Sequence, residues 1–269
     1  MNGLMKLTGR VMKACGGFYQ VFLEEQNNVT CKIRGKLKDD IYVGDLVEIS
    51  LIGTSEGIIE KVLPRNILLK RPYISNVDHV FVVFALAKPE PNYFLIDRYL
   101  LIMEEANLGV TLVFNKQDLV GRRVTKEWTD YYRKVGYDVI STSALLGEGK
   151  RKLQTRVAGH VSVFTGPSGV GKSALLNMIG DWGLVTGNLS LKIDRGKHTT
   201  RVVQLLPFKN KGFVADTPGF TQLDLSHIKP ESLGKYFPDL YKFSLQCRFT
   251  GCQHRSEPQC SVKQALHEG

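Results

Sequence analysis

The sequence of 269 residues contains no apolar run long enough to cross a membrane. Its longest run, around Val80 to Ala87, is far shorter than the ~18 residues of a membrane helix and is typical of a buried strand. The first residues, MNGLMKLTGR, lack the apolar segment of a secretory signal. We therefore expect a cytoplasmic protein with no membrane partner.

Acidic residues are scarce in one part of the chain. The whole sequence has a net charge of +10, yet residues 150–214 hold eleven lysines and arginines and only two acidic residues, Asp181 and Asp194. A solvated basic surface is one interpretation. The clustering favours the other, a polyanionic partner such as nucleic acid, because one bound nucleotide cannot neutralise so large an excess.

Cysteine is also rare, and the five cysteines fall into two groups. Cys15 and Cys31 lie in strand-like segments and are expected to be small buried apolar side chains. The other three lie near the carboxyl terminus, where Cys247, Cys252, His254 and Cys260 form the pattern C-x4-C-x-H-x5-C. Three thiolates and one imidazole complete a tetrahedral Zn²⁺ shell with no open position, so the pattern predicts one structural zinc rather than disulfides.

Hydrophobic patterning predicts a multidomain protein, in which a small N-terminal β-domain precedes an α/β domain. Residues 6–63 contain five short strand-like runs, which fit a small OB-type β-barrel, with an SH3-like barrel as the alternative. Pro64 to Asn76 is predicted to be a linker. From Val77 onward buried strands alternate with helices, predicted at Tyr93 to Ala106 and Thr125 to Val135, which indicates a mostly parallel sheet. We predict domains at residues 1–65, 66–220 and 221–269, the last one holding the zinc.

A phosphate-binding loop follows the predicted strand HVSVFTG. The segment GPSGVGKS matches GxxxxGK[ST], and its glycines allow backbone N–H groups to surround phosphates at the start of a helix. Lys172 supplies a charge for the β- and γ-phosphates, and the Ser173 hydroxyl is placed to bind Mg²⁺. The predicted nucleotide contacts are Gly166, Pro167, Ser168, Gly169, Val170, Gly171, Lys172, Ser173 and Ala174. This loop also resembles that of guanylate kinases, which leaves a phosphotransferase as an alternative.

Two further motifs predict that the base is guanine. Asn115-Lys116-Gln117-Asp118 resembles NKxD, in which the aspartate accepts two hydrogen bonds from guanine, the lysine packs over the base and the asparagine ties loops together. Adenine would leave the Asp118 carboxylate unpaired, which costs several kcal/mol. Ser143-Ala144 resembles the loop whose backbone N–H contacts the guanine oxygen.

A third motif, Asp216-Thr217-Pro218-Gly219, resembles DxxG, in which the aspartate reaches Mg²⁺ through water and the glycine N–H contacts the γ-phosphate. The motifs of an ordinary GTPase therefore occur in the order four, five, one, three. A circular permutation explains this order, because joining the old ends and cutting elsewhere leaves each loop at its place in the sheet. The segment Leu145 to Gly159 is the predicted join.

This permuted order, with an OB-like barrel before it and a Cys/His cluster after it, resembles the ribosome small subunit-dependent GTPase A family (RsgA, also called YjeQ) over essentially the whole chain. The resemblance implies a GTPase of late small-subunit maturation that binds ribosomal RNA and is stimulated by the subunit. It implies GTP or GDP, Mg²⁺ and one structural Zn²⁺ as ligands. We expect a monomer.

The resemblance extends to the segment DRGKHTTR, residues 194–201, where a threonine closes on Mg²⁺. Thr200 is the first candidate and Thr199 the second. Phe220 stands where Ras-like enzymes carry a water-orienting glutamine, so intrinsic hydrolysis is expected to be slow. His198 is the candidate for positioning the water, with an RNA or phosphate contact as the alternative, and Gln222 is a weaker candidate. Slow hydrolysis leaves open a non-enzymatic RNA-binding scaffold switched by guanine nucleotide.

Overall fold

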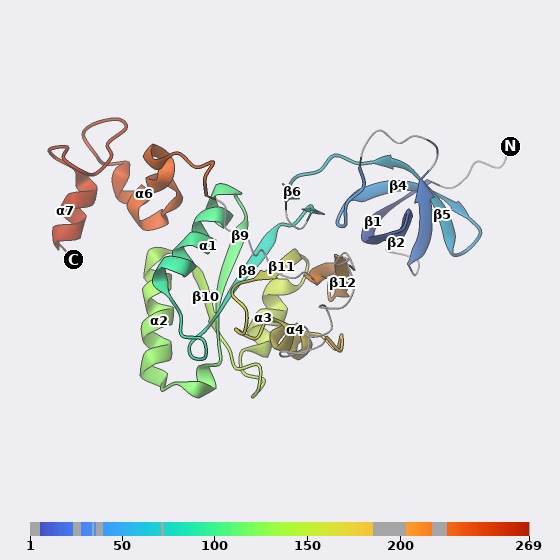
Figure 1. Ribbon diagram of the computed structural model, residues 1–269, viewed down its shortest axis with the longest axis horizontal. Coiled ribbons are helices and arrows are strands. Elements are labelled where there is room, and N and C mark those ends of the chain that lie inside the picture. The colour runs from blue at the N-terminus through green and yellow to red at the C-terminus, as the bar shows by residue number, and fades with distance from the viewer. Residues whose placement is uncertain are drawn as a thin grey trace.

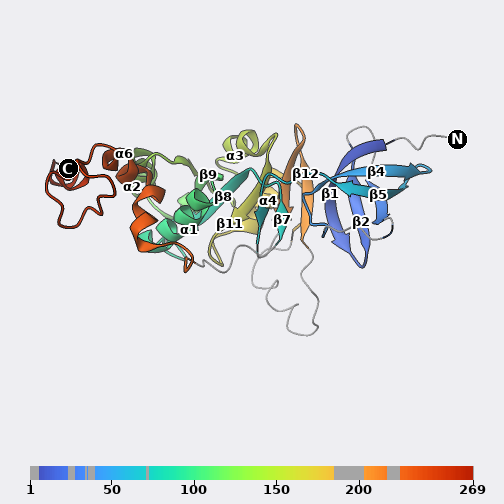
Figure 2. The same cartoon turned by 90° about the horizontal axis from the view of Figure 1, so that it is seen from above.

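The computed structural model describes three parts arranged in a row, with a β-barrel at one end and a helical segment at the other (Figures 1 and 2). An α/β domain lies between them. The described residues are 6–23, 28–33, 35, 40–70, 73–184, 203–216 and 225–268, without the side chain of Asp216.

The first part is a closed barrel of five strands. These are β1 (Lys6–Cys15), β2 (Phe18–Phe22), β3 (Val29–Ile33), β4 (Leu46–Ile52) and β5 (Glu56–Val62). They pair in the order β1-β2-β3-β5-β4, and β4 pairs back to β1, which closes the barrel. Alternate residues such as Val47 and Ile49 point inward and are fully buried. The predicted N-terminal barrel is confirmed.

A short hairpin follows the barrel where a linker was predicted. Its strands are β6 (Leu68–Leu69) and β7 (Ile74–Ser75). Before it, Arg65 donates to the buried Asp45 carboxylate over 2.6 Å and holds the outgoing chain against the barrel.

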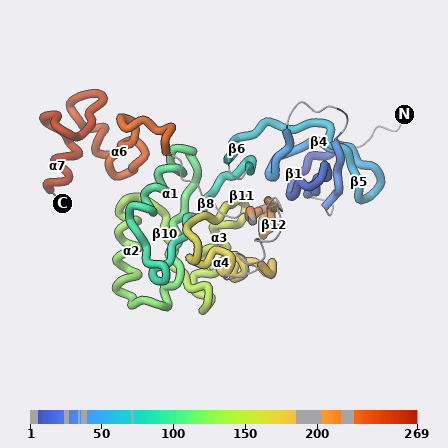
Figure 3. The backbone as a smooth tube through the Cα atoms, in the orientation of Figure 1, coloured from blue at the N-terminus to red at the C-terminus, as the bar shows by residue number. Residues whose placement is uncertain are grey.

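The central sheet has the strand order β10-β9-β8-β11-β13-β12. Its strands are β8 (His79–Ala85), β9 (Gly109–Asn115), β10 (Asp138–Ser141), β11 (Val161–Thr165), β12 (Gln204–Phe208) and β13 (Gly212–Asp216). All pairs are parallel except β12 with β13, and Lys13 of the barrel pairs with Gln204 of β12. The chain passes through β8, β9 and β10 before it reaches β11 (Figure 3). The carboxyl ends of the parallel strands therefore form one edge for ligands.

Helices cover both faces of this sheet, which explains why the inner strands β8, β9 and β11 are buried on both faces. In β8, Val80 and Val82 face the core under α1 (Tyr93–Glu105) and α2 (Arg122–Val135), while Phe81 and Val83 face α3 (Lys150–Val157) and α4 (Lys172–Ile179). α1 and α2 lie where helices were predicted. The segment 145–159, predicted as the join of the permuted ends, contains helix α3, which buries Leu153 and Val157 completely.

The last part contains η3 (Pro230–Tyr236), α6 (Pro238–Ser244) and α7 (Ser261–Glu268). Within residues 225–268 one side chain, Cys260, is fully buried. An apolar core therefore does not hold these helices together. In the described ranges, no helix combines the length and the hydrophobicity that crossing a membrane requires.

Candidate nucleotide site and metal centre

Asn115 joins three loops at the carboxyl edge of the sheet. Its side chain is 1% exposed at the end of β9. The Nδ2 group donates to the carbonyl of Val170 over 2.8 Å, and Oδ1 accepts from the Thr142 hydroxyl and the Ala144 N–H, each over 3.1 Å. The predicted base-reading loop, Ser-Ala loop and phosphate loop are thus held by one amide, although Asn115 precedes Val170 by 55 residues in the chain.

The two residues predicted to hold the base follow directly. Lys116 adopts a left-handed backbone (φ 62°), which ends β9 and starts the 3₁₀ turn η1 (Gln117–Leu119). Its Nζ donates to the carbonyl of Gly169 over 2.7 Å and also to that of Lys88, so its side chain lies across the phosphate loop. The half-buried Asp118 carboxylate has no hydrogen bond or ion pair with any residue that the structure describes. Its oxygens are free to accept hydrogen bonds from a ligand.

The Ser-Ala loop is closed by a pair of backbone hydrogen bonds between Ser143 and Glu148, of 3.2 and 3.0 Å. Ser143 is fully buried, and its hydroxyl accepts from the Leu146 N–H over 3.1 Å. The Ala144 N–H already donates to Asn115. A guanine oxygen at this loop must therefore share that donor or take it over.

Close packing explains why the phosphate loop needs two of its glycines. A Cβ on Gly166, whose φ is +137°, would lie 2.1 Å from the carbonyl oxygen of Val83. A Cβ on Gly171, whose φ is +95°, would lie 2.4 Å from the Asn115 amide nitrogen. Each glycine lets the loop approach a neighbouring strand end more closely than any side chain allows. The path of the loop is therefore fixed by close packing against strand β8 and the Asn115 side chain.

Lys172 is the first residue of α4 and is folded over the loop. Its Nζ donates to the carbonyls of Gly166 and Pro167, over 2.8 and 2.7 Å. Burial lowers the pKa of Lys172 to about 8, because the ammonium group has lost water. A phosphate beside it would favour the charged form. Ser173 follows, half-buried, in the first turn of the helix.

The Cys/His cluster has the size of a tetrahedral metal site. The sulfurs of Cys247 and Cys260 are 3.9 Å apart, and His254 Nδ1 lies 3.7 Å from the first and 3.3 Å from the second. With Cys252, the four ligand atoms all lie within 4.8 Å of one another. Zinc–ligand bonds of about 2.0–2.3 Å predict tetrahedral edges of about 3.5–3.8 Å. The donors and their spacing therefore fit zinc, as the sequence predicted.

Part of the predicted site lies outside the described residues. This applies to His198, Thr199, Thr200, Gly219, Phe220, Gln222 and the side chain of Asp216. Asp216 itself ends β13 beside β11, whose last residue leads into the phosphate loop. The roles of the residues outside the described part of the chain stay predictions.

Sequence reasoning missed three contributors to these loops. Thr142 is fully buried, and its hydroxyl donates to Asn115. Glu148 accepts from the Gln117 side chain over 2.5 Å and so links the base-reading loop to the Ser-Ala loop. The carbonyl of Lys88 fixes Lys116. Thr142 adjoins a recognised motif, which is a weak signal, whereas the other two contacts depend on the fold alone.

The Asn115 contacts predict the effect of removing this amide. Asn115→Ala leaves buried polar groups in three loops without partners, each costing about 1–3 kcal/mol. We expect GTP and GDP to bind about 10- to 100-fold more weakly in calorimetric titrations. Thr129→Ala is the matched control, because it removes a buried hydroxyl hydrogen bond within α2 and touches none of the loops. Equal nucleotide affinity of Asn115→Ala and the control would contradict the role of Asn115.

Comparisons with known proteins agree with this geometry. Residues 62–226 match the profile of the RsgA GTPase family, and residues 8–59 match that of the RsgA N-terminal domain. The small ribosomal subunit biogenesis GTPase RsgA of Caldanaerobacter subterraneus subsp. tengcongensis is 42% identical over 268 residues, which cover 98% of this chain and 90% of the relative. The protein of the same name from Alkaliphilus metalliredigens is 44% identical over 267 residues, which cover 97% and 91%.

Two solved structures share the fold over nearly the whole chain. YjeQ from Thermotoga maritima superposes with a TM-score of 0.84 at 36% identity, covering 98% of this chain and 92% of that one. YloQ, described as a circularly permuted GTPase, superposes with a TM-score of 0.83 at 33% identity, covering 100% and 91%.

Proposed function

The chain belongs to the RsgA family of circularly permuted GTPases, and on this premise we propose that it acts in late maturation of the small ribosomal subunit. In this proposal it binds the subunit, and the subunit stimulates GTP hydrolysis. The observation that carries the proposal is the Asn115 amide, which fixes a guanine-reading loop against a phosphate loop that comes later in the chain. That arrangement fits a guanine nucleotide.

The described loops assign roles to the residues that hold GTP or GDP. Asp118 accepts from the base, Lys116 covers it, and the Ser143-Ala144 loop faces its oxygen. The phosphates lie in the cradle of residues 166–174, where Lys172 exchanges its two carbonyl partners for phosphate oxygens. Gly219 is the proposed contact to the γ-phosphate.

Mg²⁺ and Zn²⁺ have separate places in the proposal. Ser173, Thr200 and Asp216 offer oxygen ligands, which suit Mg²⁺, and the ion supplies positive charge at the phosphates. Zn²⁺ is held by Cys247, Cys252, His254 and Cys260, where it has a structural role because four protein ligands leave no open position.

Hydrolysis requires a group that positions water, and Phe220 cannot do so because it has no hydrogen-bonding group. We assign this role to His198, whose imidazole can hold or accept a proton near neutral pH. Thr200 and Lys172 complete the proposed catalytic set. Slow intrinsic hydrolysis follows from the phenylalanine at position 220, and acceleration by the subunit is part of the proposal.

The partner is the small subunit with its ribosomal RNA, which the basic excess of residues 150–214 favours. The barrel and the zinc segment lie on opposite sides of the GTPase domain (Figure 2), and we propose that both contact RNA. We propose a monomer acting where ribosomes are assembled, the cytoplasm. The proposed domain boundaries are 1–65, 66–220 and 221–269.

GTP turnover measured against added small subunits tests the function. We expect the rate to rise with subunit concentration and to saturate. His198→Ala is expected to lower the stimulated kcat by about 10²–10³-fold with little change in KM for GTP, as for loss of a group that acts on the water. Turnover that does not respond to subunits would favour the non-enzymatic scaffold, and a rise in KM alone would make His198 a phosphate contact.

A further inference from the structure

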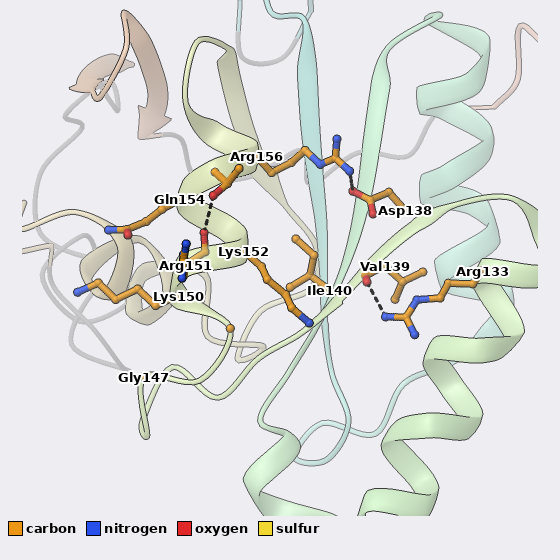
Figure 4. Close-up of a pocket in the computed structure, with 12 residues that line it drawn as sticks. Arg133, Asp138, Val139, Ile140, Gly147, Lys150, Arg151, Lys152, Gln154 and Arg156 are labelled. Carbon is orange, nitrogen blue, oxygen red and sulfur yellow. Dashed lines mark hydrogen bonds and ion pairs between the residues drawn. The ribbon is translucent and has the colours of Figure 1, made fainter.

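A large basic groove runs along the free edge of the central sheet. It has a volume of about 1150 Å³ and lies between α2 and α3, with Val139 and Ile140 of the outermost strand β10 between them (Figure 4). Five cationic side chains line it: Arg133, Lys150, Arg151, Lys152 and Arg156. Asp138 is the single acidic residue among its lining residues. The groove is separate from the proposed nucleotide contacts.

Two of the five cations are already engaged within the protein. Arg156 forms an ion pair of 2.6 Å with Asp138, which neutralises that carboxylate. Arg133 donates to the Val139 carbonyl over 3.0 Å and covers an edge of β10 that has no strand partner in the described sheet. Both are anchored at fixed positions in the groove.

The other three cations are consecutive and exposed at the start of α3. Lys150, Arg151 and Lys152 have no ion pair with any residue in the described part of the chain. The helix that carries them is held in place by the fold, because its Leu153 and Val157 are completely buried against the core. As consecutive residues they do not face one another but spread around the first turn of the helix (Figure 4). Their positive charge is therefore distributed along the groove, where an extended anionic partner can contact it.

The helix that carries these charges is attached to both halves of the nucleotide site. Gly149, at its amino end, adjoins the Ser143–Glu148 hydrogen bonds that close the Ser-Ala loop. Gln154 donates to the carbonyl of Ile179, at the end of the helix that follows the phosphate loop. An anion bound in the groove therefore contacts the element that links the base-reading and phosphate-reading sides.

We propose that this groove binds the phosphodiester backbone of ribosomal RNA, as a contact of the GTPase domain with the small subunit. The inference rests on the proposed function and adds the place and chemistry of a contact. A single small anion would need converging, buried donors, whereas these cations are exposed and spread over two helices. Such a spread matches the successive phosphates of an RNA strand. No base-reading group is required, so the contact depends on charge and shape.

The test replaces Lys150, Arg151 and Lys152 with glutamine and measures binding to purified small subunits with a non-hydrolysable GTP analogue, across a range of salt concentrations. We expect affinity to fall about tenfold or more at low salt. The slope of log K against log salt should become shallower by about 2–3, one for each lost phosphate contact. The protein-free rRNA of the small subunit is a second probe and should show the same losses.

Two further variants isolate the effect. Arg123, Lys126 and Lys134 on the exposed face of α2 offer a matched control, because their replacement by glutamine removes three charges outside the groove and should leave the salt slope unchanged. The combination Lys150→Arg, Arg151→Lys and Lys152→Arg keeps the charge and should retain binding. Thermal unfolding of every variant identifies any that fails to fold. If the glutamine variant fails, the charge-retaining and control variants show whether binding follows the charge in the groove.

The outcomes separate this inference from the proposed function. Parent protein that does not bind small subunits refutes the function itself. If the parent protein binds and the α3 triple variant has the same affinity and salt slope, the function stands and the proposed RNA contact in the groove is refuted. Loss of affinity for subunits without loss for protein-free rRNA would show that the groove contacts a ribosomal protein, and would overturn the RNA assignment.

Discussion

Asp118→Ala is expected to weaken GTP binding by about 10³-fold or more and to abolish the preference for GTP over ATP. The Asp118 carboxylate is half-buried and has no partner among the described residues, so its hydrogen-bonding capacity is available to a ligand. Guanine offers the carboxylate two adjacent N–H donors, whereas adenine leaves it unpaired. A site built around such hydrogen bonds rejects ligands that lack them by about 10⁴–10⁵-fold. Competition titrations with GTP and ATP measure both effects.

A substitution of the same size gives a sharper test of the same contact. Asp118→Asn keeps one acceptor and turns the other into a donor, which suits xanthine, because xanthine carries a carbonyl where guanine carries an amine. We expect this variant to bind xanthosine triphosphate more tightly than GTP. Asp130→Asn is the matched control, since Asp130 lies on α2 with its side chain 43% exposed and forms an ion pair with Arg133 of the same helix. Unchanged GTP affinity in Asp118→Ala, or equal competition by ATP, would disprove the guanine pocket.

Much of this site could be predicted because its motifs stand at the ends of strongly apolar strands. β8 and β9 are buried on both faces, so their positions follow from composition, and parallel strands bring their carboxyl ends together. The predicted proximity of Asn115 to the phosphate loop is confirmed by its 2.8 Å hydrogen bond to Val170. The circular permutation did not obscure this contact, because it depends on where the strand ends lie in the sheet and not on the order of the strands in the chain.

The parts that could not be predicted depend on contacts between segments without a local pattern. Helix α3 has the sequence KRKLQTRV, in which only Leu153 and Val157 are apolar. These two residues lie one turn apart and are the ones that the helix buries in the core. Two such residues in eight are too few to mark a helix. The hydrogen bond from the Ala144 N–H to Asn115 likewise depends on where two strand ends meet, which spacing along the chain does not determine.

Removal of zinc is expected to unfold residues 225–268 while the barrel and GTPase domain stay folded. Cys260 is the one fully buried side chain of this segment, so apolar burial contributes little to its stability. Structural zinc sites contribute about 10–16 kcal/mol in apparent binding free energy, far more than a single buried thiol. Chelation at neutral pH should release one zinc per chain, abolish slow amide exchange in η3, α6 and α7, and leave GTP binding intact.

Single cysteine variants test whether the cluster itself is responsible. Cys252→Ala removes one ligand of four and should reproduce the chelated state, with loss of metal and rapid proteolysis confined to the C-terminal segment. Cys15→Ala is the matched control. The prediction that Cys15 is buried was wrong, because it lies exposed at the end of β1, far from the cluster in sequence, and its replacement should retain full zinc content. Slow exchange in α6 and α7 after complete loss of metal would show that helix packing alone holds the segment. The small apolar burial of this segment argues against that result, because Cys260 is its one buried side chain and little besides the metal can hold the helices together.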